Sequence, residues 1–260
     1  SNFRKVNRHL RSLLDTHPPT HNFGEIWIET HQDSVEASYK SRNGTSYDIV
    51  YKTENAKDFV KMFSQDFKLA LSYQKSPLPT LILYAAEQTS GREEISTILK
   101  SRTKHLPVKN LELIVNTQSE ALKILPFVDP DVLEAIQLYQ LDKDQPHIPL
   151  KAEELEHLTQ WKSATVLFSD FWIQDTSSLH HFLHFQTVIV RVEKFPELDL
   201  LGRMLNADVY QSWAESTYHK IPNSKHLLRV AVNYFNVHFE RVDSESVQYD
   251  ANSPLTFFVV

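Results

Sequence analysis

Strand-like and helix-like segments alternate along most of this chain of 260 residues, and this alternation constrains the fold most strongly. Apolar runs predict strands centred near Ile82, Leu113, Ile136, Val166 and Ile189. Segments with helical spacing of apolar residues precede or separate these strands, at residues 56–72, 92–101, 119–127, 152–158 and 178–183. The strand centres lie about 23 to 31 residues apart, within the range of strand–helix repeats. The sequence therefore predicts an α/β fold.

A single strand–helix unit cannot bury both faces of its strand, whereas stacked units can. We therefore expect an irregular leucine-rich-repeat-like strand–helix solenoid with a curved, mostly parallel sheet and helices on one side. The consensus leucine-rich pattern with its asparagine ladder is not present in the sequence. An ordinary doubly wound sheet is the alternative fold.

The first quarter of the chain predicts a helix followed by an antiparallel β-meander. Apolar residues at helical spacing from Phe3 onward, ended by two prolines, indicate a helix that is already under way where the sequence starts. Strands are predicted over residues 25–30, 34–41 and 46–53, and Asn43-Gly44 is typical of the hairpin turn between the last two. Toward the end of the chain we expect a helix over 196–205, strands over 226–233 and 237–242, and an apolar tail over 255–260.

Composition excludes several classes of function. The chain has no cysteine, which rules out disulfides, thiolate metal sites and cysteine nucleophiles. Its four glycines lie far apart, so a glycine-rich phosphate loop cannot form. The net charge of -6 disfavours binding to nucleic acid or to an anionic membrane. There is no apolar run of transmembrane length. We expect a cytoplasmic or nuclear protein without a cofactor.

Residues that could carry chemistry are better explained as structural or surface residues. His180 and His184 share a helix face, as zinc ligands can, but further ligands are missing. Glu153 and Glu154 with His157 favour a solvated helix face. Asp170 and Asp175 are interpreted as loop aspartates that flank a strand end. A basic run lies at a predicted helix end, where cations interact favourably with the helix dipole; it comprises Lys100, Arg102, Lys104, His105 and Lys109.

Aromatic residues point to function more clearly, because tryptophan and tyrosine dominate binding hot spots. The four tryptophans are Trp27, Trp161, Trp172 and Trp213. We interpret Trp161 as a core residue. Phe171 and Trp172 lie just after a predicted strand, and we expect one of them to face outward and bind a partner.

Three segments carry a resemblance to a known family. Residues 122–138 read LKILPFVDPDVLEAIQL, residues 106–115 read LPVKNLELIV, and residues 160–164 read QWKSA. Together they resemble the FTH domain, the F-box-associated domain of nematode F-box proteins; the matching framework residues are Leu125, Pro126, Phe127, Pro130 and Trp161. Residues 228–242 resemble the family's closing strand pair, and FRKVNRHLRSLLDTHPP resembles the last helix of an F-box whose front half is absent here.

The resemblance implies three segments: the truncated F-box at 1–19, the meander at 20–54 and the FTH-like domain at 55–260. It also implies a non-enzymatic adaptor of a cullin-type ubiquitin ligase. The complete F-box would dock on a Skp-type adaptor and cullin, with Phe3, Val6, Leu10 and Leu13 as the remnant of that contact. The associated domain would bind an unknown substrate protein. A binding module that sequesters a partner outside a ligase is the alternative, and a hydrolase with an unfamiliar site ranks below it.

Overall fold

A computed structural model of the chain describes residues 23–53, 56–74, 76–85, 89–141, 148–174, 181–182, 184–192, 217–220, 226–233 and 236–243. The chain divides into two compact units. The first comprises Ser1–Gln145 with Leu158–Ala164, and the second comprises Pro146–His157 with Thr165–Val260. The helix predicted near Phe3, the helix at 196–205 and the apolar tail lie outside the described residues, as does most of the predicted helix at 178–183. The predicted segment boundaries after residues 19 and 54 stay predictions.

The first unit is built on a mixed sheet with the strand order β3-β2-β1-β4-β5-β6. Strands β1 (Phe23–Thr30), β2 (Ser34–Ser41) and β3 (Ser46–Lys52) form the predicted antiparallel meander. Gly44 closes the second hairpin with a φ of 91°, which glycine adopts without strain. Strands β4 (Leu78–Ala85), β5 (Val108–Val115) and β6 (Ala135–Gln140) continue from β1 in parallel. The meander and the strand–helix units therefore share one sheet.

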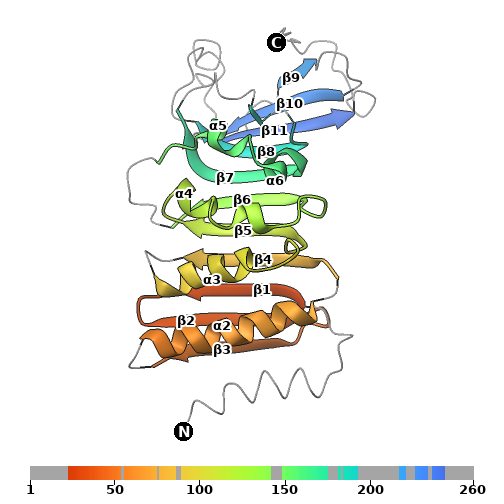
Figure 1. Cartoon of the computed structure of the whole chain (residues 1–260). Helices are drawn as coiled ribbons and strands as arrows, with labels where there is room; N and C mark the ends of the chain where they lie inside the picture. Colours follow the sequence, from red (N-terminus) through yellow and green to blue (C-terminus); the bar gives the residue numbers. More distant parts are fainter. Residues whose placement is uncertain are drawn as a thin grey trace. The chain divides into compact units, whose positions relative to one another are not determined.

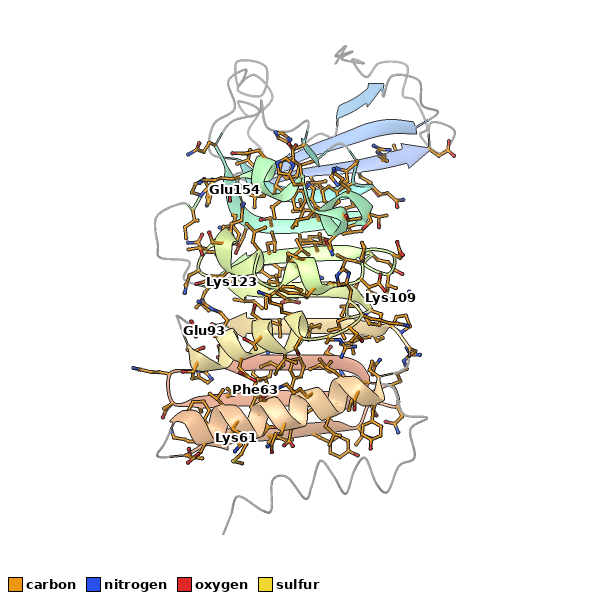
Figure 2. The ribbon with its side chains drawn as sticks, in the orientation of Figure 1. Lys61, Phe63, Glu93, Lys109, Lys123 and Glu154 are labelled. Carbon is orange, nitrogen blue, oxygen red and sulfur yellow. The ribbon has the colours of Figure 1, made fainter. Side chains whose placement is uncertain are left out.

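The described helices of the first unit lie on one side of this sheet (Figure 1). They are α2 (Ala56–Tyr73), α3 (Ser90–Lys100), α4 (Gln118–Ala121), the 3₁₀ helix η1 (Leu125–Phe127) and α6 (Thr159–Ser163). Figure 2 labels Phe63 and Lys61 on different sides of α2, and Phe63 is buried whereas Lys61 is exposed. Phe63 is fully buried and stacks on Phe67 with ring centroids 5.5 Å apart. Apolar residues at helical spacing thus bury one helix face against the strands.

A polar pair lies inside this apolar layer. The Tyr51 hydroxyl donates a hydrogen bond of 3.1 Å to the Asp66 carboxylate, and both residues are buried. Burial is the main cause that raises the pKa of Tyr51 far above its ordinary value. The tyrosine therefore stays neutral and keeps its donor proton.

We expect Tyr51→Phe to lower the free energy of unfolding by about 1–3 kcal/mol, because Asp66 would lose a buried donor. Tyr47 lies on the same face of β3, is partly exposed and has no hydrogen bond within the described part of the chain. Tyr47→Phe is the matched control and should change stability by less than about 0.5 kcal/mol. Urea denaturation of both variants measures the difference, and equal losses would contradict this role for Tyr51.

Within the second unit the strand order is β7-β8-β11-β10-β9, with parallel and antiparallel pairs. Strands β7 (Val166–Ile173) and β8 (Thr187–Val192) are parallel. Strands β11 (Asn236–Asp243), β10 (His226–Asn233) and β9 (Thr217–Lys220) follow in antiparallel pairs. The short helix α5 (Ala152–Leu155) also belongs to this unit. The predicted strand pair at 226–233 and 237–242 is confirmed.

The α/β class is confirmed, but the expectation of a mostly parallel sheet is not, since the described residues pair in both directions. The helix predicted over 119–127 is wrong as a continuous helix. It divides into α4 and η1, because Pro126 lies in the first turn of η1 and has no amide proton for a longer helix. The sequence also gave no prediction of α6 or β9.

Candidate functional site

The side of the first unit's sheet that no described helix covers is the candidate site, and we call it the open face. Side chains alternate between the two faces of a strand. In β1, Ile26 and Ile28 are fully buried on the helix side, so Trp27 between them lies on the open face and is partly exposed. The same alternation places Glu25, Glu29 and their cross-strand neighbours on the open face.

Two rows of cross-strand neighbours show what the open face presents. The first row runs from β3 to β6 through Val50, Glu36, Glu29, Tyr84, Ile114 and Tyr139. The second row runs in parallel through Asp48, Ser38, Trp27, Ile82, Glu112 and Gln137. Val50 is 54% exposed, an unusual value for a large aliphatic residue. Aromatic and aliphatic side chains are therefore interleaved with carboxylates on this face.

Carboxylates outnumber cations on the open face. Glu25, Glu29, Glu36, Asp48 and Glu112 lie on it, whereas its lysines are Lys40 and Lys52. One of these lysines is already used, because the Lys52 ammonium lies 2.6 Å from the Asp33 carboxylate. The face therefore carries a net negative charge.

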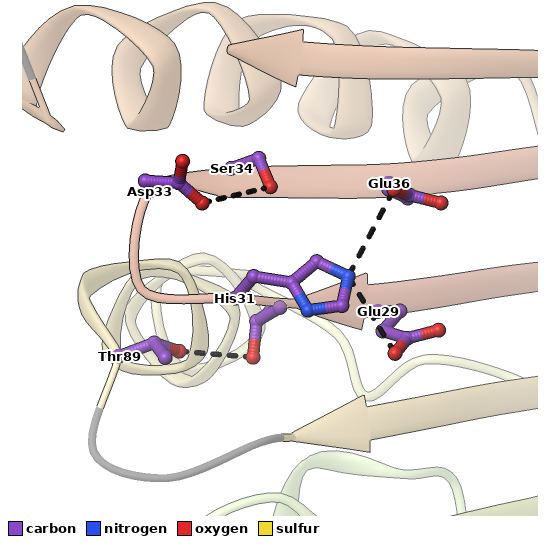
Figure 3. A network of polar contacts seen from close by, with 7 residues as sticks. Glu29, His31, Asp33, Ser34, Glu36 and Thr89 are labelled. Atoms are coloured by element: carbon purple, nitrogen blue, oxygen red, sulfur yellow. Dashed lines mark hydrogen bonds and ion pairs between the residues drawn. The ribbon is translucent and has the colours of Figure 1, made fainter. Parts of the chain in front are cut away.

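A histidine bridges two of these carboxylates at the β1–β2 turn (Figure 3). The His31 Nε2 atom lies 3.5 Å from the Glu29 carboxylate and 3.9 Å from that of Glu36. On the helix side of the same turn, the Thr89 hydroxyl donates to the Thr30 hydroxyl at 2.9 Å and ties the start of α3 to β1. A hydrogen bond on the helix side thus fixes this turn, while the side chains of Glu29 and Glu36 lie on the open face.

Three carboxylates on the open face, those of Glu25, Asp48 and Glu112, form no ion pair within the described part of the chain. Glu25 lies opposite Lys40 on β2 and Thr80 on β4, whereas Glu112 lies beside Ile82. Partial burial, with the nearby charge of Glu25, raises the pKa of Glu112 above its ordinary value. The charged form of Glu112 is therefore less favourable in the folded protein than in the unfolded chain.

This raised pKa predicts that Glu112→Gln increases the stability of the protein at neutral pH. Above its ordinary pKa of 4.5, Glu112 ionises more readily in the unfolded chain than in the folded protein. Stability therefore falls as the pH rises through this range, and glutamine removes the loss. We expect the variant to melt above the wild type at pH 7, with the difference vanishing near pH 3. Asp131→Asn, at an exposed turn, is the control for the charge change alone, and an equal gain there would contradict the prediction.

The predicted framework residues come together at a junction on the helix side of the sheet. The Gln160 side-chain amide donates to the carbonyls of Pro126 and Val128, at 3.1 and 2.8 Å. Leu106 exchanges backbone hydrogen bonds of 2.9 Å with the same loop, through Phe127 and Asp129. The three sequence segments around residues 106, 126 and 160 are therefore joined in space. Leu125 and Trp161 are fully buried, as expected of a core, whereas Phe127 and Pro130 are partly exposed.

The expectation that Phe171 or Trp172 faces outward is wrong. Phe171 is fully buried and Trp172 is only 7% exposed. Residues 148–150 lie against the end of β7, where the Leu150 amide donates to the Trp172 carbonyl at 2.7 Å. The register of β7 on β8 also shifts between Phe168 and Trp172, which ends the simple alternation of faces. These two residues are core residues of the second unit.

The other candidate residues are dispersed. His184 is exposed and contacts Phe185, and Glu153, Glu154 and His157 are exposed on or after α5. His180 and Asp175 lie outside the described residues, and Asp170 is buried. Where the structure describes the chain, no three acidic, histidine or cysteine residues gather as a metal site. The neighbouring His181 instead lies 2.6 Å from Glu156.

The residues of the basic run do not form a common site, because their surroundings differ. Lys109 pairs with Glu134 at 2.5 Å, and burial lowers the pKa of Arg102, while Lys100, Lys104 and His105 are exposed. The remnant residues Phe3, Val6, Leu10 and Leu13 lie outside the described part. No described helix is both long and apolar enough to cross a membrane.

An α/β domain thus carries the candidate site, with a buried motif junction and one sheet face that no described helix covers. Comparison with protein families identifies an FTH domain at residues 91–202. The FTH family is F-box-associated, which agrees in general with a role in substrate recognition. The match contains the junction of Pro126, Val128 and Gln160 and starts within α3, so it is shorter than the resemblance predicted from the sequence. No curated protein and no solved structure matches the chain.

The sequence did not single out the open face, although its signal was present. The alternation in residues 25–30 separates Ile26 and Ile28 from Trp27. What the alternation could not supply is which side the helices cover.

Proposed function

We propose that this chain is the protein-recognition, substrate-binding domain of an F-box adaptor in a cullin-type ubiquitin ligase. The observation that carries the proposal is the FTH domain at residues 91–202, since this domain is associated with F-boxes. The resemblance of residues 3–19 to the end of an F-box adds to it, as does a nematode origin inferred from the same resemblance. A cytoplasmic or nuclear location belongs to the proposal.

The structure of the first unit is compatible with this role. Strand–helix units with parallel strands β1, β4, β5 and β6 support a leucine-rich-repeat-like arrangement, although the meander adds antiparallel strands. Repeats of this kind commonly use an extended sheet face to bind other proteins. The open face, with Trp27, Tyr84 and Tyr139, offers the aromatic residues that dominate protein interfaces.

Co-purification of the full-length protein, with a complete F-box, tests the ligase part of the proposal. We expect it to bring down a Skp-type adaptor and a cullin, and to lose both when the F-box is deleted. Absence of both from the wild-type purification would reject the ligase role. If a partner is retained and its abundance does not depend on the F-box, the protein acts instead as a module that sequesters that partner.

A further inference from the structure

We propose that the open face binds a segment of a partner protein in which arginine or lysine side chains alternate with apolar ones. The inference rests on the proposed role in protein recognition and names the chemistry of the partner. In the bound state a cationic side chain lies between Glu25 and Glu112 beside Trp27, and apolar side chains contact Tyr84, Ile114 and Tyr139.

The dimensions and composition of the open face fit a segment better than a whole domain. Neighbouring strands are about 4.8 Å apart, so the rows from β3 to β6 extend over about 24 Å. A patch of this width and three side chains deep is smaller than the roughly 800 Å² that each partner contributes to a standard interface. Its aromatic residues come from β1, β4 and β6 and are partly exposed. Such residues anchor a short segment through buried area.

The net negative charge of the open face favours a positively charged partner segment. Lys40 lies opposite Glu25, but neither Glu25 nor Glu112 forms an ion pair among the described residues, and five carboxylates against two lysines leave negative charge uncompensated. Trp27 pairs with Ile82, the direct neighbour of Glu112, so an aromatic ring and a carboxylate flank the same position. A guanidinium or ammonium group is attracted both to carboxylates and to the face of an indole ring. Polyanions such as nucleic acids are repelled by the same charges.

The cost to stability supports a binding role for these carboxylates. A partly buried glutamate beside another glutamate destabilises the folded protein, and nothing in the described fold uses its charge. Local features that oppose folding without a structural gain are typical of functional sites. A structural role for Glu112 would require its replacement to weaken the fold, whereas a binding role requires stability to rise and binding to fall in the same variant.

Selection from a random peptide library displayed on phage, with the 260-residue chain as bait, tests the proposal. We expect enriched peptides to alternate Arg or Lys with apolar residues. A synthetic peptide of the enriched consensus should bind the double variant Glu25→Gln/Glu112→Gln about tenfold more weakly than wild type, and Trp27→Leu similarly. The matched control is Glu93→Gln/Asp131→Asn, which removes two charges from exposed positions off the open face and should bind like wild type.

Each other outcome overturns the inference. Enrichment of peptides without basic residues, no enrichment, or equal weakening in the two double variants would do so. Binding of a second copy, seen as a dimer in sedimentation and lost in the Glu25→Gln/Glu112→Gln variant, would assign the face to self-association instead. If a peptide of residues 1–17 displaces the consensus peptide, the occupant of the open face would be a segment of this chain rather than a partner protein. The co-purification experiment tests the ligase role independently. If the open face binds basic peptides but no Skp-type adaptor co-purifies, only the ligase role is rejected.

Discussion

Arg92→Met is expected to lower the free energy of unfolding of the first unit by about 3–5 kcal/mol. The Arg92 side chain is 7% exposed and forms an ion pair with Glu120, which is 10% exposed, so α3 and α4 are joined by two buried charges. The Asn116 amide also donates to the Glu120 carboxylate, at 2.9 Å. Without the guanidinium, a buried carboxylate would keep one backbone donor and lose its counter-charge. Removing one partner of a buried pair is therefore far more harmful than removing both.

The double variant Arg92→Met/Glu120→Gln separates this explanation from loss of packing. Glutamine can still accept the Asn116 amide and carries no charge, so the double variant should recover much of the loss. Lys109→Met is the control, because the Lys109–Glu134 pair is exposed and worth at most about 1 kcal/mol. Urea denaturation, with hydrogen exchange of β5 amides to localise the effect, measures all three. A double variant no more stable than Arg92→Met would show that the stem of the arginine matters rather than its charge.

Local sequence patterns predicted most helices and strands, but they could not predict contacts between residues distant in sequence. Alternating residues and Asn43-Gly44 were enough for the meander, which forms from neighbouring strands. No local pattern indicates that β1 pairs with β4, because that choice depends on where α2 packs. Helix α6 is five residues long, too short to show a helical period. Pro126 was a signal in the sequence, and a prediction that weighed its missing amide would have ended the helix earlier.

The candidate site was harder to predict than the fold, since exposure depends on what covers a strand. The sequence favoured Phe171 and Trp172 because they follow a predicted strand, but residues 148–150 lie against that strand end and bury them. It gave no reason to prefer Trp27, which sits between two buried isoleucines and reaches the open face. Trp161 was correctly interpreted as core. The family framework residues Leu125 and Trp161 are buried in the fold, whereas the residues of the open face that we propose as a binding site come partly from outside the matched region.

Trp161→Ala is expected to destabilise the first unit by about 3–5 kcal/mol, the usual cost of emptying the site of a buried tryptophan. Trp161 is fully buried and is the largest such side chain in the described structure. Its neighbour Gln160 holds the carbonyls of Pro126 and Val128, so a cavity at Trp161 also loosens the junction of the three framework segments. Gln160→Ala should cost less, about 1–3 kcal/mol, because it removes two hydrogen bonds and creates a smaller void.

Trp27→Leu is the matched control for Trp161→Ala, since Trp27 lies in the same unit but on the open face. It should cost less than about 1 kcal/mol while weakening binding of a basic segment. Trp161→Ala should have the opposite profile, with faster hydrogen exchange in β5 and β6 and, at temperatures where the unit stays folded, unchanged affinity for the basic peptide. Weaker peptide binding by folded Trp161→Ala would mean that the junction and the open face are energetically coupled. Equal stability losses for the two tryptophans would mean that Trp27 is also a core residue, and the open face would then lack its central aromatic contact.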